Sequence, residues 1–355
     1  MNPRAKTVVV LVAAIAVAGA GTVGYLLSPP PPSPCSGVDL GLPAGNGSAS
    51  LQNPGALPGG GTPSSLDERP ASPRPLLSAP LQVVAAENFW GSLVGQLGGN
   101  QTSVLSIVND PNTDPHEYEA NTSDAEAIAA AQFVVVNGVG YDDWALQLLA
   151  ADGHSGQVVL NVGDLNGVSV GGGILSGNPH LWYNPVYVNR TVAAMYADLV
   201  ELRPSAAAIF QANYAGLNTS LGAVDAQAGL IRHDFAGTVV ASTESIFAYL
   251  ANYTGLDLVS PPEFMEAVAE GNDPSAQAVV QFQCQLESGK VSLLVYNEQT
   301  VTPLTTSMKA LAVAHNVSLV GVTETIQPPN VSYQTWMDAE LLTLQDALNA
   351  KALGG

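Results

Sequence analysis

Two histidines lie in short, proline-rich segments of a kind that can hold a metal ion. His116 stands in the run Asp110-Pro-Asn-Thr-Asp-Pro-His-Glu-Tyr-Glu119, and His180 in the run Asn178-Pro-His-Leu-Trp-Tyr-Asn-Pro185. Each proline fixes its own φ angle and moves the residue before it away from helical geometry, so both histidines are expected in rigid loops. Neutral imidazole is the commonest transition-metal ligand, but such a histidine can also be a general base or an ordinary loop residue.

Two glutamates complete a set that could bind a metal. Glu244 and Glu324 each follow an apolar run that predicts a strand, at residues 237–241 and 317–322. Because α/β sheets bind ligands at the carboxyl ends of their strands, these side chains could meet the two histidines. A site of imidazoles and carboxylates suits Mn²⁺, Zn²⁺ or Fe²⁺ and disfavours metals that prefer thiolates. Each glutamate could equally be a helix cap or a salt-bridge partner.

Several other polar residues are weaker candidates. Asp114 and Glu117 flank His116 and could orient its imidazole or be ordinary loop acids. Glu298 also follows a predicted strand and could orient a ligand. The remaining histidines stand in polar or helix-end contexts and are expected to be solvated, namely His154, His233 and His315.

The elements that must position these residues alternate between strands and helices. Such alternation predicts parallel sheets covered by helices, here arranged as two βαβ lobes of the α/β class. A long helical pattern between the lobes predicts a rigid connector. Because each lobe carries two of the four candidate ligands, the metal site is expected in the interlobe cleft. The expected segments are a leader or anchor at 1–27, a Pro/Gly/Ser-rich tether at 28–80, an N-terminal lobe at 81–204, the connector at 205–235 and a C-terminal lobe at 236–355.

The N-terminus predicts a location outside the cytoplasm. Arg4 and Lys6 precede an uncharged run, Val8 to Leu27, which is either a cleaved signal peptide or a retained membrane anchor, and retention is favoured. The protein is therefore expected to be tethered to the membrane or secreted. Eight Asn-x-Ser/Thr sequons fit a secreted glycoprotein, although chance in an Asn-, Ser- and Thr-rich chain is an alternative.

The cysteines and the net charge exclude other classes of function. Cys35 and Cys284 do not make a disulfide framework, and Cys284, in an apolar helical pattern, is expected to be a buried apolar side chain. The formal net charge of -20 repels nucleic acid and anionic membranes, which excludes nucleic-acid binding.

Five motifs resemble those of one protein family in their sequences and in their order along the chain. They are the His116 run, Val136-Asn-Gly-Val-Gly-Tyr-Asp-Asp-Trp144, Asn178-Pro-His-Leu-Trp182, Ser242-Thr-Glu-Ser-Ile-Phe-Ala-Tyr-Leu250 and Val322-Thr-Glu-Thr325. Over about residues 81 to 353 the chain resembles the cluster-9 substrate-binding proteins of manganese/zinc ABC transporters.

This resemblance implies one divalent metal held between the lobes by His116, His180, Glu244 and Glu324. Glu244 stands where zinc-type members usually have a histidine, and Glu324 where an aspartate is usual. This harder ligand set, together with the absence of a His-rich loop at 163–178, favours Mn²⁺ over Zn²⁺, with Fe²⁺ a further possibility.

The function implied is capture of the metal by a monomer and delivery to an ABC permease and its ATPase. Two alternatives remain. One is a surface adhesin or a secreted metal-buffering protein. The other is a metal-dependent hydrolase, which is disfavoured because His-Glu-x-x-His, a nucleophile elbow and a phosphate loop are all absent from the sequence.

Overall fold

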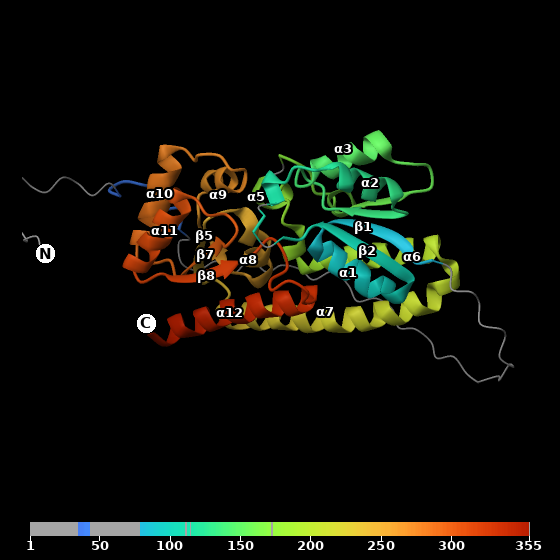
Figure 1. Cartoon of the computed structure of the whole chain (residues 1–355). Coiled ribbons are helices and arrows are strands. Elements are labelled where there is room, and N and C mark those ends of the chain that lie inside the picture. The colour runs from blue at the N-terminus through green and yellow to red at the C-terminus, as the bar shows by residue number, and fades with distance from the viewer. Residues whose placement is uncertain (1–34, 43–78, 111, 114, 172, 355) are drawn as a thin grey trace, which may run out of the picture.

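The structure, a computed structural model, describes residues 35–42, 79–110, 112–113, 115–171 and 173–354 (Figure 1). The expectations for the segment Val8–Leu27, for most of the tether, for the Asn46 sequon and for Asp114 fall outside these residues. Within the described ranges, no helix is both long enough and apolar enough to cross a membrane.

The first half of the described chain forms a four-stranded parallel sheet in the order β2-β1-β3-β4. Its strands are β1 (Leu81–Glu87), β2 (Thr102–Val108), β3 (Phe133–Val136) and β4 (Val158–Asn161). The helices of this half are α1 (Asn88–Gly98), α2 (Thr122–Ala130), α3 (Asp143–Asp152), α4 (Val162–Asn166), α5 (Gly173–Ser176) and α6 (Pro185–Leu202). All four residues of β3 are buried, as expected for a strand covered on both faces.

The second half repeats this architecture with a parallel sheet in the order β6-β5-β7-β8. Its strands are β5 (Val239–Ser242), β6 (Asp257–Leu258), β7 (Leu293–Asn297) and β8 (Ser318–Val322). Its helices are α8 (Ala248–Thr254), α9 (Pro262–Ala269), α10 (Ala276–Glu287) and α11 (Pro303–Ala314). The prediction of two parallel-sheet α/β units is confirmed.

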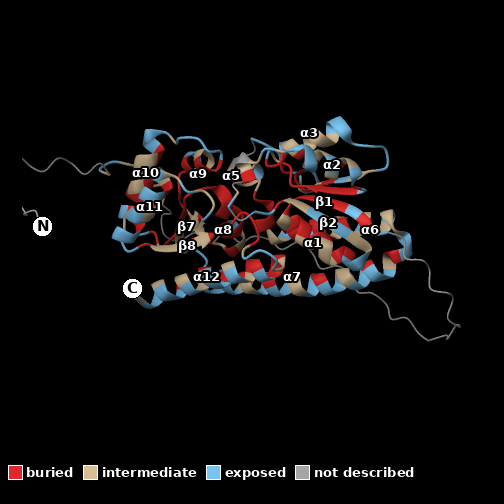
Figure 2. Cartoon of the chain, viewed as in Figure 1, coloured by how far each residue is buried: buried red, intermediate tan, exposed pale blue. Residues whose placement is uncertain are grey.

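Two long helices contact each other along one side of the molecule, the first beneath both units and the other beneath the second unit (Figure 1). They are α7 (Ala207–Phe235) and α12 (Tyr333–Gly354). At 1.5 Å per residue, the 29 residues of α7 reach about 44 Å, which is enough to pass under both units. Figure 2 shows that α7 buries the side facing the sheets and exposes the other. Residues of both sheets and of both helices share one continuous apolar core.

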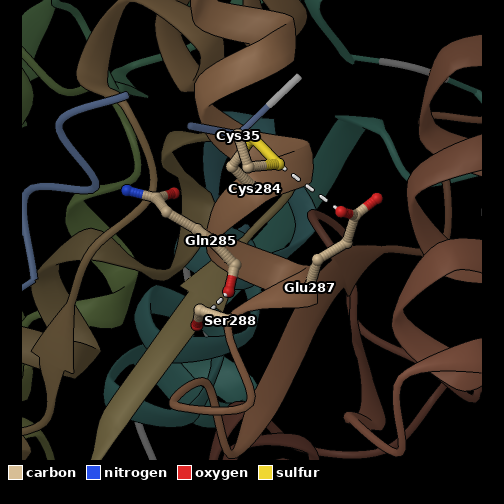
Figure 3. Close-up of a disulfide and its surroundings, with 5 residues drawn as sticks. All are labelled: Cys35, Cys284, Gln285, Glu287 and Ser288. Carbon is tan, nitrogen blue, oxygen red and sulfur yellow. Dashed lines mark hydrogen bonds between the residues drawn. A yellow bond between two sulfur atoms is a disulfide. The ribbon is translucent and has the colours of Figure 1, made fainter. Parts of the chain in front are cut away.

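The structure contradicts the expectation for the two cysteines. Cys35 and Cys284 form a disulfide across 249 positions of sequence (Figure 3). Cys284 is buried on α10, as expected, but it is bonded rather than free. Segment 35–42 lies against the second unit, because Gln285 Nε2 donates to the Leu40 carbonyl at 2.6 Å and Leu42 packs on the apolar cluster there. Spacing in the sequence could not indicate a pair joined only by tertiary folding.

Candidate metal site

Three of the four predicted ligands converge between the two units. Donor atoms of His116, His180 and Glu324 all lie within 4.8 Å of one another. Nε2 of His116 is 3.7 Å and Nε2 of His180 is 3.5 Å from Oε1 of Glu324. His180 and Glu324 are fully buried, whereas the His116 side chain is 18% exposed and therefore marks the side from which an ion can enter.

A short proline-initiated turn after β2 presents His116. Pro115 begins a single 3-10 turn that ends at Glu117, and Asp110 accepts hydrogen bonds from the Asn112 side chain and backbone within the preceding loop. The His116 ring lies edge-on to Tyr141, with centroids 4.8 Å apart. The expected rigid loop is thus stabilised by local hydrogen bonds and by an aromatic contact.

The orientation of His180 is set by its neighbour Asn178. Oδ1 of Asn178 lies 2.7 Å from Nδ1 of His180 and also accepts from the His180 backbone N–H at 2.9 Å. An amide oxygen only accepts, so Nδ1 carries the proton and Nε2 keeps its lone pair for a metal. Nδ2 of Asn178 donates to the Ser245 carbonyl of the second unit at 2.7 Å. One side chain therefore fixes the tautomer of His180 and links the two units.

Both carboxylate oxygens of Glu324 receive hydrogen bonds. Nδ2 of Asn297, at the end of β7, donates to Oε1 at 2.7 Å, and the Tyr141 hydroxyl, from the loop after β3, donates to Oε2 at 2.9 Å. Oε1 is also the oxygen nearest to both histidines. One oxygen of Glu324 therefore faces the two histidines, and the other is held by Tyr141.

Gln299 connects the loops that carry Glu324 and His116. Its Oε1 accepts from the backbone N–H groups of Glu324 at 2.7 Å and Thr325 at 3.0 Å. Its Nε2 donates across the junction to the carbonyl of Thr113 at 2.9 Å, three residues before His116. No pattern in the sequence marks Gln299 as a functional residue, and the candidate predicted in this loop, its neighbour Glu298, is exposed.

Glu244 is fully buried at the end of β5 but does not belong to the group of three donors in the described chain. It adjoins Ser245, whose hydroxyl lies 3.4 Å from Nδ1 of His180. Glu244 is thus the sequence neighbour of a residue that contacts His180. The other histidines, His154, His233 and His315, are exposed as expected.

Burial and neighbouring groups shift the ionisation of the site. Burial lowers the pKa of His180, and this outweighs the opposing effect of Glu324. Burial raises the pKa of Glu324, but His116, His180 and Tyr141 together lower it further, so the net pKa lies below its usual value. A neutral imidazole and an ionised carboxylate are the forms that bind metal ions.

Two cavities adjoin His116. One, of about 340 Å³, also contacts Tyr141, Asn178 and Ser245. The other, of about 630 Å³, contacts Gln299 and the acidic residues Glu270 and Asp273. Neither is lined by a lysine or an arginine, so the approach to His116 favours a cation.

Comparisons with known proteins agree in family and fold. The model of the family described as "ZnuA: Zinc-uptake complex component A periplasmic" matches residues 83–347. The manganese-binding lipoprotein MntA of Halalkalibacterium halodurans is 31% identical over 136 residues, which are 38% of this chain and only 43% of MntA.

Solved structures share the fold at low identity. FpvC of Pseudomonas aeruginosa, solved in complex with Mn²⁺, aligns with a TM-score of 0.63 and 22% identity over 76% of this chain and 99% of its own. The periplasmic zinc-binding protein TroA of Treponema pallidum aligns with a TM-score of 0.64 and 17% identity over 76% and 99%.

Proposed function

Since the chain belongs to the ZnuA family of metal-uptake components, we propose that it captures a divalent transition metal outside the cytoplasm and delivers it to an ABC importer. The observation that carries this proposal is the convergence of His116, His180 and Glu324 within 4.8 Å at the junction of the two units. Glu244 is proposed as the fourth ligand, reached by a small movement of the loop after β5.

Capture of the ion neither forms nor breaks a covalent bond in the protein. The ion exchanges water for two imidazole nitrogens and for carboxylate oxygens, and the hydrogen bonds from Asn178, Asn297 and Tyr141 limit the reorganisation that binding requires. A protein shell of four ligands leaves no open position for a reacting water, so an enzymatic role is disfavoured. Whether the N-terminal segment is retained as an anchor or cleaved, the folded units would lie outside the cytoplasm, where the permease can receive the ion and its ATPase can drive import from the other side of the membrane.

Mn²⁺ is the proposed cargo, with Zn²⁺ next. Two carboxylates make the ligand set harder than one rich in histidine, and hard oxygen ligands suit Mn²⁺. MntA, a relative, is described as manganese-binding. Raw affinity does not decide the cargo, because most N/O sites bind Zn²⁺ more tightly than Mn²⁺.

Competitive calorimetry with Mn²⁺ and Zn²⁺ tests the proposal. The wild-type chain should bind one ion tightly, His180→Ala should lose that site, and His233→Ala should keep it because His233 is 84% exposed and outside the cluster. Weak binding at several sites that His180→Ala leaves unchanged would mean that the acidic surface alone attracts the ions. Delivery is tested separately, by capture of the permease from membranes on the metal-loaded protein.

A further inference from the structure

Asn-x-Ser/Thr triplets are more frequent in this chain than its composition explains. It has 22 asparagines and 46 serines and threonines in 355 residues, so a random order would give about three triplets (22 × 46/355). Eight occur, and seven of them lie in the described part of the chain. The excess alone does not say whether the triplets are accessible, but the structure does.

All seven asparagines of these triplets are exposed. They are Asn100, Asn121, Asn189, Asn218, Asn252, Asn316 and Asn330. Of the twelve described asparagines outside triplets, only four are exposed. Asparagines in triplets are therefore exposed more often than those outside, seven of seven against four of twelve, and a chance distribution of triplets would not favour exposed positions.

The side-chain nitrogen that would carry a sugar is available in all seven. Among the described residues, Nδ2 donates an intramolecular hydrogen bond in eight of the twelve asparagines outside triplets and in none of the seven inside. Where a triplet asparagine has a structural role, as Asn121 does in capping α2, the oxygen makes the contact. Substitution at Nδ2 would leave that cap intact.

The positions also leave the metal site accessible. None of the seven lines either cavity beside His116. By contrast, the buried asparagines that hold the site together, Asn137, Asn178 and Asn297, use their Nδ2 atoms as donors and stand outside triplets. A bulky substituent would thus be tolerated at the triplet positions, whereas on Asn137, Asn178 or Asn297 it would disrupt the site.

We propose that this protein is N-glycosylated at these exposed asparagines and that the glycans cover the outer faces of both units while sparing the approach to His116. The donor would be an oligosaccharide linked to a polyprenyl phosphate or diphosphate, used by a membrane transferase. Nδ2 forms the bond to the anomeric carbon, the bond from that carbon to the phosphate oxygen breaks with its electron pair leaving on the phosphate, and the amide proton passes to a base of the transferase.

Mass spectrometry of the full chain, purified from the membranes and medium of the organism that makes it, tests the proposal. The intact mass should exceed that of the polypeptide, which is at most 36.4 kDa, and peptides containing the seven asparagines should carry hexose-based adducts. Asn218→Gln should remove the mass of one glycan, as should Ser220→Ala. Ser220→Thr should keep it.

The matched control is Asn349→Gln, because Asn349 is also exposed on a helix but belongs to no triplet. It should leave the glycan mass unchanged. An intact mass equal to that of the polypeptide, with all seven peptides unmodified, would overturn the proposal. So would adducts that persist in Asn218→Gln and Ser220→Ala at the Asn218 peptide, since they would lie on another residue.

Discussion

His180 combines full burial with a fixed tautomer, and both properties affect its competition between protons and metal. Burial disfavours the charged imidazolium, so the pKa of His180 lies below the ordinary value for a histidine. Because the neutral form binds metal, Nε2 remains competent at a lower pH than that of an ordinary histidine. Protonation at lower pH then removes this ligand.

An NMR titration of the metal-free protein checks this expectation. The imidazole resonances of His180, assigned by their loss in His180→Gln, should titrate with a midpoint below pH 6.5. A His180 midpoint at or above 6.5 would show that the Glu324 carboxylate, rather than burial, dominates.

At the scale of elements, the loop after β7 holds the site together. Asn297, the last residue of β7, and Gln299 both contact Glu324, whereas Glu298 between them is exposed. The apolar run of β7 therefore predicts a functional loop at its end, but it does not predict which polar side chain of that loop faces the site. Gln299 is separated in sequence from Thr113 by 186 residues and from Glu324 by 25 residues. No local pattern in the sequence predicts contacts over such separations.

Replacing Gln299 should weaken metal binding without unfolding the protein. Gln299→Leu removes the side-chain hydrogen bonds by which Gln299 connects the Glu324 loop to the His116 loop. Removing a residue that hydrogen-bonds a metal ligand typically lowers metal affinity by about 10–100-fold. Gln299→Glu keeps the acceptor and removes the donor to Thr113, so its loss should be smaller. Calorimetric affinities, read beside the Tm of the metal-free form, separate positioning from stability.

The exposed neighbour serves as the control for this series. Glu298→Gln should bind metal as the wild type does. If Gln299→Leu lowered Tm of the metal-free protein but left the affinity unchanged, Gln299 would be a structural residue with no role in positioning the ligands.

A buried pair of carboxyl groups joins the ends of β1 and β3. Asp142 accepts from the backbone N–H groups of Asn137 at 2.6 Å and Gly138 at 2.7 Å. Burial, and then the charge of Asp142, raise the pKa of Glu87, while burial raises the pKa of Asp142 to about 6.

The turn that donates to Asp142 requires glycine at position 138. Gly138 has a φ of 75°, and an added Cβ would lie 2.2 Å from Asn161.

These raised pKa values predict that stability falls as pH rises. A carboxyl group whose pKa is raised in the folded state binds its proton more tightly there than in the unfolded chain. Its contribution to the free energy of unfolding is therefore complete below the pKa of the unfolded state and is lost as the pH rises through the pKa of the folded state. For Asp142 the window runs from 3.8 to about 6. A shift of about 2 units corresponds to about 3 kcal/mol.

Glu87→Gln should flatten this dependence, because glutamine keeps a donor for Asp142 but does not titrate. The free energy of unfolding, measured in denaturant between pH 4.5 and 7.5, should fall less steeply for the variant than for the wild type. Glu298→Gln is again the control. An equal slope in Glu87→Gln and wild type would exclude the pair as the source.

At the scale of the whole molecule, the architecture could be predicted because it rests on local patterns. Apolar runs such as Phe133–Val136 predict covered strands, and the stripe of α7 predicts a long helix. The disulfide, the Tyr141–Glu324 bond and the Asn178–Ser245 link could not be predicted, because each joins segments brought together only by folding. Tyr141 lies in one of the five motifs, but its hydrogen bond to Glu324 forms only when the second unit is in place.

Removing the disulfide should destabilise the protein and spare the site. Closing a loop of this length stabilises a fold by about 2–5 kcal/mol, mainly by restricting the unfolded chain. A variant carrying both Cys35→Ser and Cys284→Ser should therefore show a lower Tm, while its metal affinity stays at the wild-type value because neither cysteine lines the cavities beside His116. An unchanged Tm would mean that segment 35–42 holds its place through Gln285 and Leu42 alone.

The bond between Cys35 and α10 also decides how mechanical load enters the molecule. Without it, only the hydrogen bond from Gln285 and the packing of Leu42 would resist tension on the chain ahead of residue 35. Once these contacts were lost, the tension would act on β1 in the middle of its sheet, between β2 and β3. With it, the same tension passes through sulfur into a helix of the second unit, and β1 is not loaded. The first sheet, which presents the loop of His116, is then shielded from forces on the N-terminal segment.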